Sequence, residues 1–307
     1  MKKEDIPVTG LILHFRTPEK TISCIQSQQE EGIHKVVVID NSEDNGNSIL
    51  SMQGGFDALR EKGLEITVIT PDHNLGFSRG VAIGLEYIST QPETHVLLIN
   101  SDAKLSTGSL IQMRSMLNEA SIVAPKILQQ NGLTTSPFSY YDRLLGLITQ
   151  RPLITPVKHA SGCCLLLHSI QVGLPLFDQD FFFYGEDAMF GFEAKNKKIS
   201  IRECPEAVIS HATSTSAKNG SIFYEYHMSR AHWLLAKKLA RNNWELSAFV
   251  AARCITLPLR ATVRAIRSQS FTAWRGLFSA TIDVLMGRHR TLTPPVIRKK
   301  PTFGEHE

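Results

Sequence analysis

The stretch that decides the fold is residues 96–103, Val-Leu-Leu-Ile-Asn-Ser-Asp-Ala. Its four apolar residues follow one another without a break and stop at Asn-Ser-Asp. A short continuous apolar run is typical of a strand that is buried on both faces, as in a parallel sheet. Such sheets bind their ligands beyond the carboxyl ends of the strands. Asp102 is therefore expected at the edge of the sheet where ligands bind.

Asp102 has two open interpretations. A single carboxylate at that edge suits a divalent cation that carries a phosphate, because Mg²⁺ prefers one or two protein carboxylates together with phosphate oxygens and waters. Alternatively, Ser101 and Asp102 cap a following helix, since Ser-Thr-Gly-Ser at 106–109 resembles a helix start. These residues alone do not decide between the two.

Strands and helices are expected to alternate around this stretch. Short apolar runs predict the strands, and apolar residues at helical spacing predict the helices between them. The predicted strands are 8–15, 35–40, 64–70 and 96–102, and the predicted helices begin at 17–19, cover 48–62 and run from 80 to about 87. The alternation predicts an α/β fold with a mainly parallel sheet flanked by helices.

Two more polar segments are expected at the same edge. Asp40 and Asn41 end a strand, where a carboxylate can accept hydrogen bonds from a ribose or a base. A turn built on Asp-Asn-Ser is an equally open alternative. Residues 74–80, Asn-Leu-Gly-Phe-Ser-Arg-Gly, are a glycine-rich loop before a helix, so their amides could meet a phosphate. The loop matches no Walker or GxGxxG pattern and is a weak signal by itself.

The middle of the chain, 106–215, is expected to be less regular. The predicted elements are a helix near 110–117, a strand at 121–127, a long loop at 129–156, a strand at 161–168, a helix at 187–197 and a strand at 200–211. Long loops in compact domains are often functional, so the segment 129–156 is a candidate for a binding role.

Glu186 and Asp187 are the candidate catalytic acids. Four aromatic residues, 181–184, come directly before them. A carboxylate beside apolar walls loses solvation, which raises its pKa and suits a general base. The alternative is that the two acids cap the helix that follows. His211 stands at a strand end, where an isolated histidine is more often structural than a ligand.

Composition narrows the class of protein. The 307 residues, with 42% apolar and 20% charged residues, suit one large or two modest globular domains. The start lacks the apolar region of a signal peptide, and no apolar run approaches about 18 residues, so neither a leader nor a spanning helix is expected. Five cysteines without a CxxC pair indicate reduced thiols in a cytoplasmic protein rather than a zinc site.

The C-terminal part is basic. From residue 220 onward there are 14 Lys and Arg and 5 Asp and Glu, although the whole chain has a net charge of only +4. Four arginines are predicted on one face of a helix that Pro258 should break or kink, and five apolar residues form a stripe after them. They are Arg253, Arg260, Arg264 and Arg267, then Phe271, Trp274, Phe278, Ile282 and Leu285. They predict either contact with an anionic membrane surface or ordinary packing on the body.

Six motifs in this order resemble the family 2 glycosyltransferases of GT-A fold, and most of all their rhamnosyltransferase-like branch. The motifs are Val-Ile-Asp-Asn-Ser (38–42), Asn-Leu-Gly-Phe (74–77), Leu-Ile-Asn-Ser-Asp-Ala (98–103), Ser-Gly-Cys-Cys-Leu-Leu (161–166), Phe-Phe-Phe-Tyr-Gly-Glu-Asp (181–187) and Ser-His (210–211). The resemblance covers about residues 7–215. It implies transfer of a sugar, rhamnose among the candidates, from a dTDP- or UDP-linked donor to a glycan or lipid-linked acceptor in cell-surface polysaccharide synthesis.

The resemblance also implies roles for individual residues. The nucleotide sugar would be bound by Asp40, Asn41, Asn74, Gly76, Phe77, Arg79, Ser101 and Asp102. Asp102 stands where the family has its DxD motif and, with His211, would hold Mg²⁺ or Mn²⁺ on the diphosphate. Asp187 would be the catalytic base, with Glu186 beside it. One base and one displacement invert the anomeric centre, as in inverting glycosidases.

The sequence departs from the family pattern at two places. Asn100-Ser101-Asp102 has one acid only, and the residues after Asp187 are Ala-Met-Phe instead of the frequent Val-Asp-Leu. Two other classes therefore stay open. One is a non-catalytic nucleotide-sugar-binding or assembly protein, and the other is a sugar-phosphate nucleotidyltransferase, although residues 11–19 lack the glycine-rich basic signature that such an enzyme needs.

The expected organisation has three parts. Residues 1–215 would be the GT-A domain, with a nucleotide-sugar-binding half (1–105) and an acceptor and catalytic half (106–215). Residues 216–290 would be a helical extension and 291–307 a disordered tail. The protein is expected in the cytoplasm or peripherally at the inner face of the cytoplasmic membrane. No nucleic acid is expected as a partner, and a homo-oligomer stays open.

Overall fold

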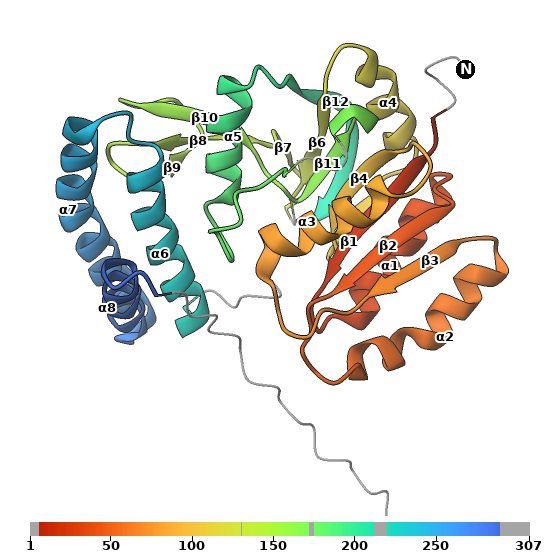
Figure 1. The fold of residues 1–307 in the computed structure, drawn as a ribbon, viewed down its shortest axis with the longest axis horizontal. Coiled ribbons are helices and arrows are strands. Elements are labelled where there is room, and N and C mark those ends of the chain that lie inside the picture. The colour runs from red at the N-terminus through yellow and green to blue at the C-terminus, as the bar shows by residue number, and fades with distance from the viewer. Residues whose placement is uncertain (1–5, 130, 172–174, 212–219, 289–307) are drawn as a thin grey trace, which may run out of the picture.

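A large mixed sheet forms the centre of the molecule. The structure, a computed structural model, describes residues 6–129, 131–171, 175–211 and 220–288. The described strands of this sheet follow the order β3-β2-β1-β4-β11-β6-β12-β5, with β7 paired to β6 (Figure 1). They are β1 (Val8–His14), β2 (Lys35–Asp40), β3 (Glu65–Ile69), β4 (His95–Asn100), β5 (Ala103–Leu105), β6 (Ile122–Leu128), β7 (Thr134–Thr135), β11 (Cys164–Leu167) and β12 (Ile201–His211).

Strand β4 lies in the middle of this sheet. The strands β3, β2, β1 and β4 are parallel, and β11 pairs with the other edge of β4 in the antiparallel direction. Leu97 and Ile99 enter the hydrophobic core on one face of the sheet, whereas Val96 and Leu98 enter the core on the other face. The prediction of a strand that is buried on both faces is therefore confirmed.

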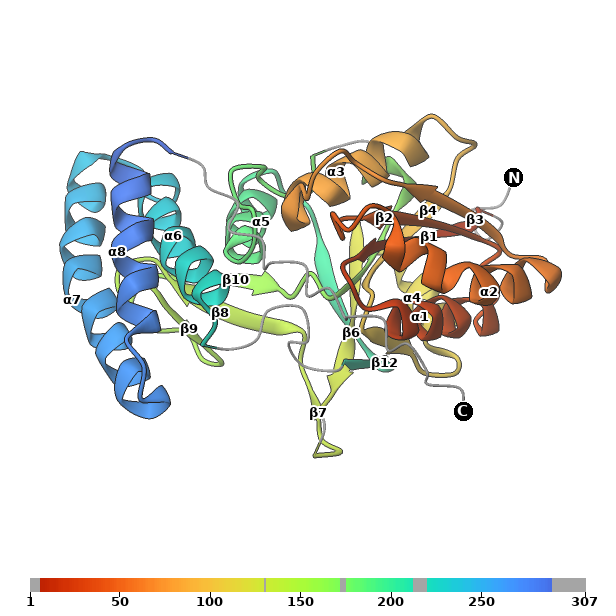
Figure 2. The same cartoon turned by 90° about the horizontal axis from the view of Figure 1, so that it is seen from below.

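Helices cover both faces of the sheet (Figure 2). The helices α1 (Pro18–Glu30), α2 (Asn47–Glu61) and α4 (Ser109–Ser115) share one core, and α3 (Gly76–Ser89) and α5 (Glu186–Asn196) share the other. The predicted α/β class is confirmed. Helix α3 begins inside the glycine-rich stretch, at Gly76 rather than after residue 80.

The long loop predicted over 129–156 is wrong for much of its length. It contains β7, β8 (Phe138–Asp142) and β9 (Leu147–Thr149), and β8 pairs with β9 and with β10 (Pro156–Ala160) in a small antiparallel sheet. The polar residues close its turns, since Asp142 accepts hydrogen bonds from Thr155 N at 2.6 Å and from Leu145 N at 2.8 Å. Antiparallel strands tolerate such a composition because one face can meet water.

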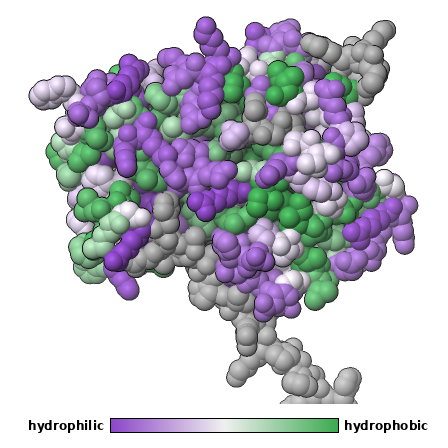
Figure 3. Space-filling view, in the orientation of Figure 1, coloured by the Kyte–Doolittle hydropathy of each residue, from purple (hydrophilic) through white to green (hydrophobic). Residues whose placement is uncertain are grey.

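Three helices follow the sheet and pack on one another beyond α5. They are α6 (Ile222–Lys238), α7 (Asn243–Ser268) and α8 (Thr272–Leu285). Helix α7 continues through Pro258, so the expected break is wrong; packing against α6 and α8 outweighs the cost of about 3 kcal/mol of an internal proline. In Figure 3, hydrophobic side chains reach the surface where these helices lie. The predicted tail lies outside the described residues.

Helix α7 also corrects the expectation that no helix could span a membrane. By length and composition, 243–268 is the one described helix that is long and apolar enough to do so, and 22% of its most apolar window is buried inside the protein. The expectation rested on the absence of a long unbroken apolar run, but a helix that contains one or two arginines can still be apolar enough to span a membrane. One such helix is weak grounds for a spanning segment.

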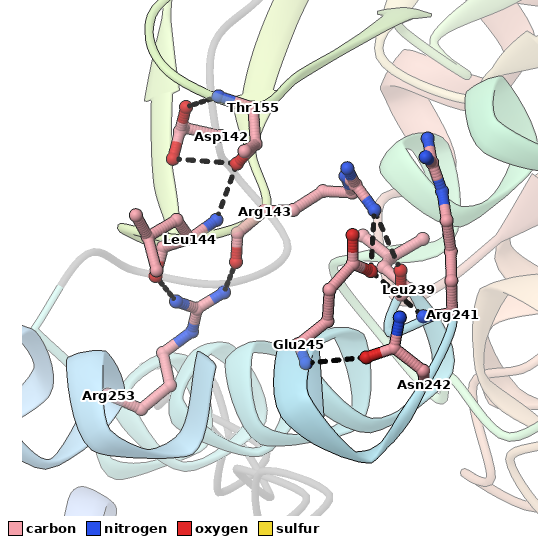
Figure 4. Close-up of polar contacts among 9 residues, drawn as sticks. All are labelled: Asp142, Arg143, Leu144, Thr155, Leu239, Arg241, Asn242, Glu245 and Arg253. Carbon is pink, nitrogen blue, oxygen red and sulfur yellow. Dashed lines mark hydrogen bonds and ion pairs between the residues drawn. The ribbon is translucent and has the colours of Figure 1, made fainter. Parts of the chain in front are cut away.

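Three of the four predicted arginines of α7 contact the rest of the protein, which supports the alternative of ordinary packing on the body over a basic membrane face. Arg253 is 0% exposed and donates to the carbonyls of Leu144 and Arg143 (Figure 4). It also donates to the Tyr141 hydroxyl. In the same close-up, Arg143 contacts Glu245 at 3.2 Å. Burial of a guanidinium is costly unless it is hydrogen-bonded, and here the hairpin β8–β9 supplies acceptors to both Nη atoms, while Nε has no partner among the described residues.

Two more arginines of that face are also bound to α6. Arg260 donates to His232 Nε2 at 2.7 Å, and Arg264 forms an ion pair with Glu225 at 2.6 Å. Arg267 alone of the four predicted arginines is exposed. The prediction that these arginines share one face of a helix was therefore correct, but this face of α7 packs against the protein and is not turned to solvent.

Candidate active site

A cavity of about 220 Å³ opens at the carboxyl ends of β1, β2 and β4, where the sequence placed the ligand. Seven predicted site residues line it, which are Asn41, Asn74, Gly76, Phe77, Ser101, Asp102 and His211. Other walls come from residues that were not predicted, among them His14, Phe15, Phe182, Phe183, Tyr184 and Phe223. The structure thus gathers segments from the whole chain around one hollow with aromatic walls.

Asp102 and His211 form the polar end of this cavity. The antiparallel pairing of β12 with β5 sets His211 opposite Ala103. As a result, His211 Nε2 lies 3.1 Å from Asp102 Oδ1. A strand that ends 109 positions later in the chain therefore brings the histidine back to the acid at the end of β4.

The alternative that Asp102 caps the next helix is wrong. Helix α4 begins at Ser109, beyond the short strand β5, and has no side-chain hydrogen bond at its N-cap. The carboxylate of Glu31 binds the amides there, since it accepts from Gly108 N at 2.7 Å and from Leu110 N at 2.9 Å. Asp102 is thus not needed for the helix that follows it.

The pair Asp102 and His211 fits a divalent cation that a diphosphate brings with it. Asp102 offers a carboxylate oxygen and His211 an imidazole nitrogen. In the ranges that the structure describes, no three His, Cys, Asp or Glu side chains form a complete metal site. One or two protein ligands suit a cation whose other ligands are phosphate oxygens and waters.

Asp40 lies beneath the cavity wall instead of in it. It is 1% exposed, and its Oδ1 accepts a hydrogen bond from Ser42 N at 3.0 Å, as the turn interpretation expected. Its Oδ2 has no partner among the described residues. Asn41 does line the cavity, and its Nδ2 donates to Gly76 O at 2.9 Å.

The glycine-rich loop positions aromatic side chains. Gly76 N donates to Asn74 Oδ1 at 2.8 Å and Phe77 N donates to Phe182 O at 2.8 Å, so the prediction that these amides meet a phosphate is wrong. Gly76 has a φ of +75°, and a Cβ there would stand 2.4 Å from Phe182 O. Arg79 does not line the cavity; its Nε donates to Gln179 O at 3.2 Å.

Glu186 and Asp187 face a second cavity of about 90 Å³. Tyr184 lines both cavities and stands between them. Its φ is +65° and that of Gly185 is +89°, two successive left-handed residues that turn the chain sharply into α5. A non-glycine residue in that region is strained by about 1–3 kcal/mol, which is common at functional sites.

The two acids occupy the first turn of α5 without capping it. The helix has no side-chain hydrogen bond at its N-cap, Gly185. Asp187 Oδ1 instead accepts a hydrogen bond from Gly162 N at 3.0 Å, across from the segment before β11. Glu186 is 8% exposed and its Oε2 has no partner among the described residues.

Burial dominates the electrostatics of this pair. It raises the pKa of Asp187 to about 7, against the lowering effect of the Gly162 hydrogen bond. Burial and the neighbouring charge of Asp187 raise the pKa of Glu186 to about 8. Burial and the repulsion between the two carboxylates thus disfavour the doubly ionised pair, which therefore retains a proton near neutral pH.

Cys163 links the two acidic centres. Burial, followed by the charges of Asp187 and Asp102, raises the pKa of its thiol to about 12, while a hydrogen bond with Ser161 opposes this shift. Its carbonyl oxygen accepts from Asn100 N at 2.9 Å. Both carboxylates thus act electrostatically on the thiol of Cys163.

The sequence analysis did not select several residues that line the two cavities, among them His14, Tyr141 and His232. His14 ends β1 and could have been found by the strand-end argument that selected Asp40 and Asp102. Tyr141 and His232, which line the second cavity, gave no such signal. Their contact, 3.1 Å between Tyr141 Oη and His232 Nδ1, joins residues 91 positions apart.

Comparisons with known proteins bear on the fold of the chain. No protein-family model matches the chain. The low-salt glycan biosynthesis hexosyltransferase Agl10 of Haloferax volcanii is 26% identical over 206 residues, which are 63% of this chain and 63% of that protein. The chain thus spans less than two thirds of the length of this curated relative.

Three solved structures resemble the chain in fold. GalNAc-T7, determined with UDP, GalNAc and Mn²⁺, has a TM-score of 0.60 at 11% identity and covers 94% of this chain and 59% of its own. The mannosyltransferase PcManGT of Pyrobaculum calidifontis, in complex with GDP-Man and Mn²⁺, has a TM-score of 0.52 at 12% identity, covering 93% and 89%. TarS of S. aureus has a TM-score of 0.50 at 12% identity, covering 92% and 93%. The expected GT-A fold is confirmed.

Proposed function

We propose that the protein is a glycosyltransferase that moves a hexose from a nucleoside-diphosphate sugar to a glycan or lipid-linked acceptor, with inversion at the anomeric carbon. The observation that carries this proposal is the pair of adjoining cavities, one with Asp102 and His211 and the other with Asp187 and Glu186. The likeness to a hexosyltransferase of glycan biosynthesis supports it. Rhamnose is the donor sugar that the sequence motifs favour.

The larger cavity suits the donor. Its aromatic walls can pack against a base and a sugar, and Asn41 and Asn74 offer amide groups to them. Asp102 and His211 would hold Mg²⁺ or Mn²⁺ at the diphosphate. Such a cation supplies Lewis-acid stabilisation of the charge on the leaving nucleoside diphosphate. Fold neighbours determined with Mn²⁺ and nucleotides support this assignment.

The smaller cavity suits the reacting part of the acceptor. Asp187 would take the proton of the attacking hydroxyl, and its hydrogen bond from Gly162 N orients the carboxylate for this role. Tyr184 separates this cavity from the donor cavity, so the acceptor oxygen would approach the sugar from the side opposite the diphosphate. A single displacement of this kind inverts the anomeric centre.

A donor panel tests the proposal. The purified protein is incubated with UDP-, dTDP- and GDP-linked hexoses, dTDP-rhamnose included, together with Mn²⁺ and a set of glycan and lipid-linked acceptors. We expect release of nucleoside diphosphate with one donor and a product of opposite anomeric configuration by NMR. Release of pyrophosphate from a nucleoside triphosphate and a sugar phosphate would identify a nucleotidyltransferase instead, and tight donor binding without any release would identify a binding protein.

The pH dependence of transfer tests the division of labour between the two acids. We expect the rate to rise with pH along a limb near 7, because Asp187 acts only when ionised and burial raises its pKa to about 7. Glu186, with a pKa of about 8, is still neutral at that point. The substitution Glu186→Gln preserves a neutral side chain and should leave the limb in place. A limb that moves to clearly lower pH would show that Glu186 ionises first.

The five cysteines support a cytoplasmic location for this reaction. All five are unpaired, and four of them are buried. Free thiols persist in reducing compartments.

A further inference from the structure

The outer face of the helical layer is apolar over its whole length. On α7, the side that faces α6 and α8 contains Leu257 and Ala261, which join Ala273 and Leu277 of α8 in a buried cluster. The opposite side, by helical spacing, consists of Trp244, Ala248, Ala251, Ile255, Leu259, Thr262 and Ile266. All seven are exposed, and the large ones strongly so: Trp244 by 87%, Ile255 by 70%, Leu259 by 62% and Ile266 by 72%.

Helix α8 continues this apolar surface. Phe271 is 77% exposed and follows Ile266 directly after the turn between the helices. Phe278 is 68% exposed and Leu285 is 81% exposed. We call the exposed apolar side chains of the two helices the α7–α8 face. Soluble monomers rarely expose a contiguous apolar surface of this extent without a binding role.

The charges around the α7–α8 face have one sign. Between residues 241 and 288, the exposed charged side chains are Arg241, Arg267, Arg275 and Arg288. The segment has two acids. The charge of Glu245 is paired with Arg143, and Asp283 is 0% exposed. The rim is therefore positive, which complements an anionic surface and opposes a symmetric contact with a second copy.

We propose that the α7–α8 face docks in the interfacial layer of an anionic lipid bilayer, with α7 and α8 parallel to the membrane plane. The apolar side chains enter the boundary between headgroups and acyl chains, and the exposed arginines contact the headgroups, as in other amphipathic interfacial helices. The proposal goes beyond the proposed transfer reaction and does not depend on it.

Helix α7 lies on the membrane in this proposal and does not cross it. Its inner side is bound to the rest of the protein through Arg253, Arg260 and Arg264. A spanning orientation would remove these contacts and leave Glu225 and the carbonyls of the β8–β9 hairpin without their partners. Breaking a buried charge from its partners is strongly unfavourable.

Vesicle sedimentation of the full chain tests the proposal. We expect the protein to bind vesicles of phosphatidylcholine with phosphatidylglycerol, to bind phosphatidylcholine alone at least tenfold more weakly, and to lose affinity as salt is raised. The fluorescence of Trp244 should shift to shorter wavelength on binding. The double variant Leu259→Asp, Phe278→Asp should lower the partition coefficient at least tenfold. Alkaline carbonate should release the bound protein, and retention after this wash would mean that α7 spans the bilayer.

Matched controls separate the face from general hydrophobicity. Leu50 and Ile111 are 71% and 69% exposed on other helices, so Leu50→Asp, Ile111→Asp should bind vesicles like the wild type. Circular dichroism verifies that both double variants are folded. Equal binding by all variants, or no vesicle binding at all, overturns the proposal. So does a dimer, detected by light scattering, that the Leu259 and Phe278 substitutions dissociate in the absence of lipid. Donor turnover with a soluble acceptor is measured in parallel, so that failure of docking is distinct from failure of the transferase assignment.

Discussion

Replacing Asp187 with asparagine is expected to lower the rate of sugar transfer by roughly 10²-fold or more, which is the usual contribution of a general base. Asparagine retains an oxygen that can accept the hydrogen bond from Gly162 N, so the fold and the segment before β11 should persist. Because Asp187 lines the smaller cavity and not the donor cavity, donor affinity should change little. Turnover is measured by nucleoside diphosphate release, and donor affinity by calorimetry.

A matched control lies on the same helix. Glu193 is a carboxylate of α5 that pairs with Lys197 at 2.9 Å, outside both cavities. The substitution Glu193→Gln should leave turnover within about twofold of the wild type, as surface changes usually do. Near wild-type turnover of the Asp187→Asn variant would refute the assignment of the base.

Replacing Asp102 with alanine is expected to abolish the metal dependence of nucleotide binding. In the wild type, Mn²⁺ or Mg²⁺ should strengthen the binding of UDP or dTDP, since Asp102 would hold the cation and the cation would offset the charge of the diphosphate. Without this carboxylate the gain should fall by at least about tenfold, the loss seen even when partners of metal ligands are removed. Titration calorimetry with and without metal measures both affinities.

The metal-free affinity serves as the internal control for this variant. In the proposed site Asp102 would act on the nucleotide through the cation, so binding of the nucleotide without metal should be nearly unchanged. Asp72→Ala is the matched variant, because Asp72 is an exposed acid in the loop after β3. If metal still strengthened binding equally in the Asp102→Ala protein, Asp102 would be only a structural partner of His211.

The strands of the donor side were predictable because each is a local pattern. The run 96–99 is apolar without a break, and such a run between helices has few alternatives to a strand in a parallel sheet. The end of a strand then places its polar residue at the binding edge, which located Asp102 and Asn41. The same rule alone overlooked the depth of Asp40, for which the alternative of an Asp-Asn-Ser turn was correct, since Ser42 N donates to Asp40 Oδ1.

The acceptor side could not be predicted in the same way because its contacts are distant in sequence. The segment 129–156 has the composition of a loop, and its hairpin is stabilised by Arg253 of α7. The helical spacing of the arginines was visible, but which face meets the protein depends on where α6 and the hairpin provide acceptors. The aromatic run 181–184 did predict raised pKa values for Glu186 and Asp187, and burial raises both. The local pattern did not show the other walls of their cavity, such as Tyr141 and His232.

The clamp between Arg253 and the β8–β9 hairpin sets the order in which the molecule can be completed during synthesis. The strands β1 to β4 are contained in the first 100 residues and can pair as soon as they leave the ribosome. The hairpin can form its hydrogen bonds with Arg253 only after this arginine has been synthesised, 109 residues after Leu144 and 112 residues after Tyr141. A nascent chain can therefore have β1 to β4 paired long before Tyr141 becomes a fixed wall of the second cavity. The first cavity also needs later residues, His211 and Phe223 among them, so neither cavity is complete until the C-terminal helices have been synthesised.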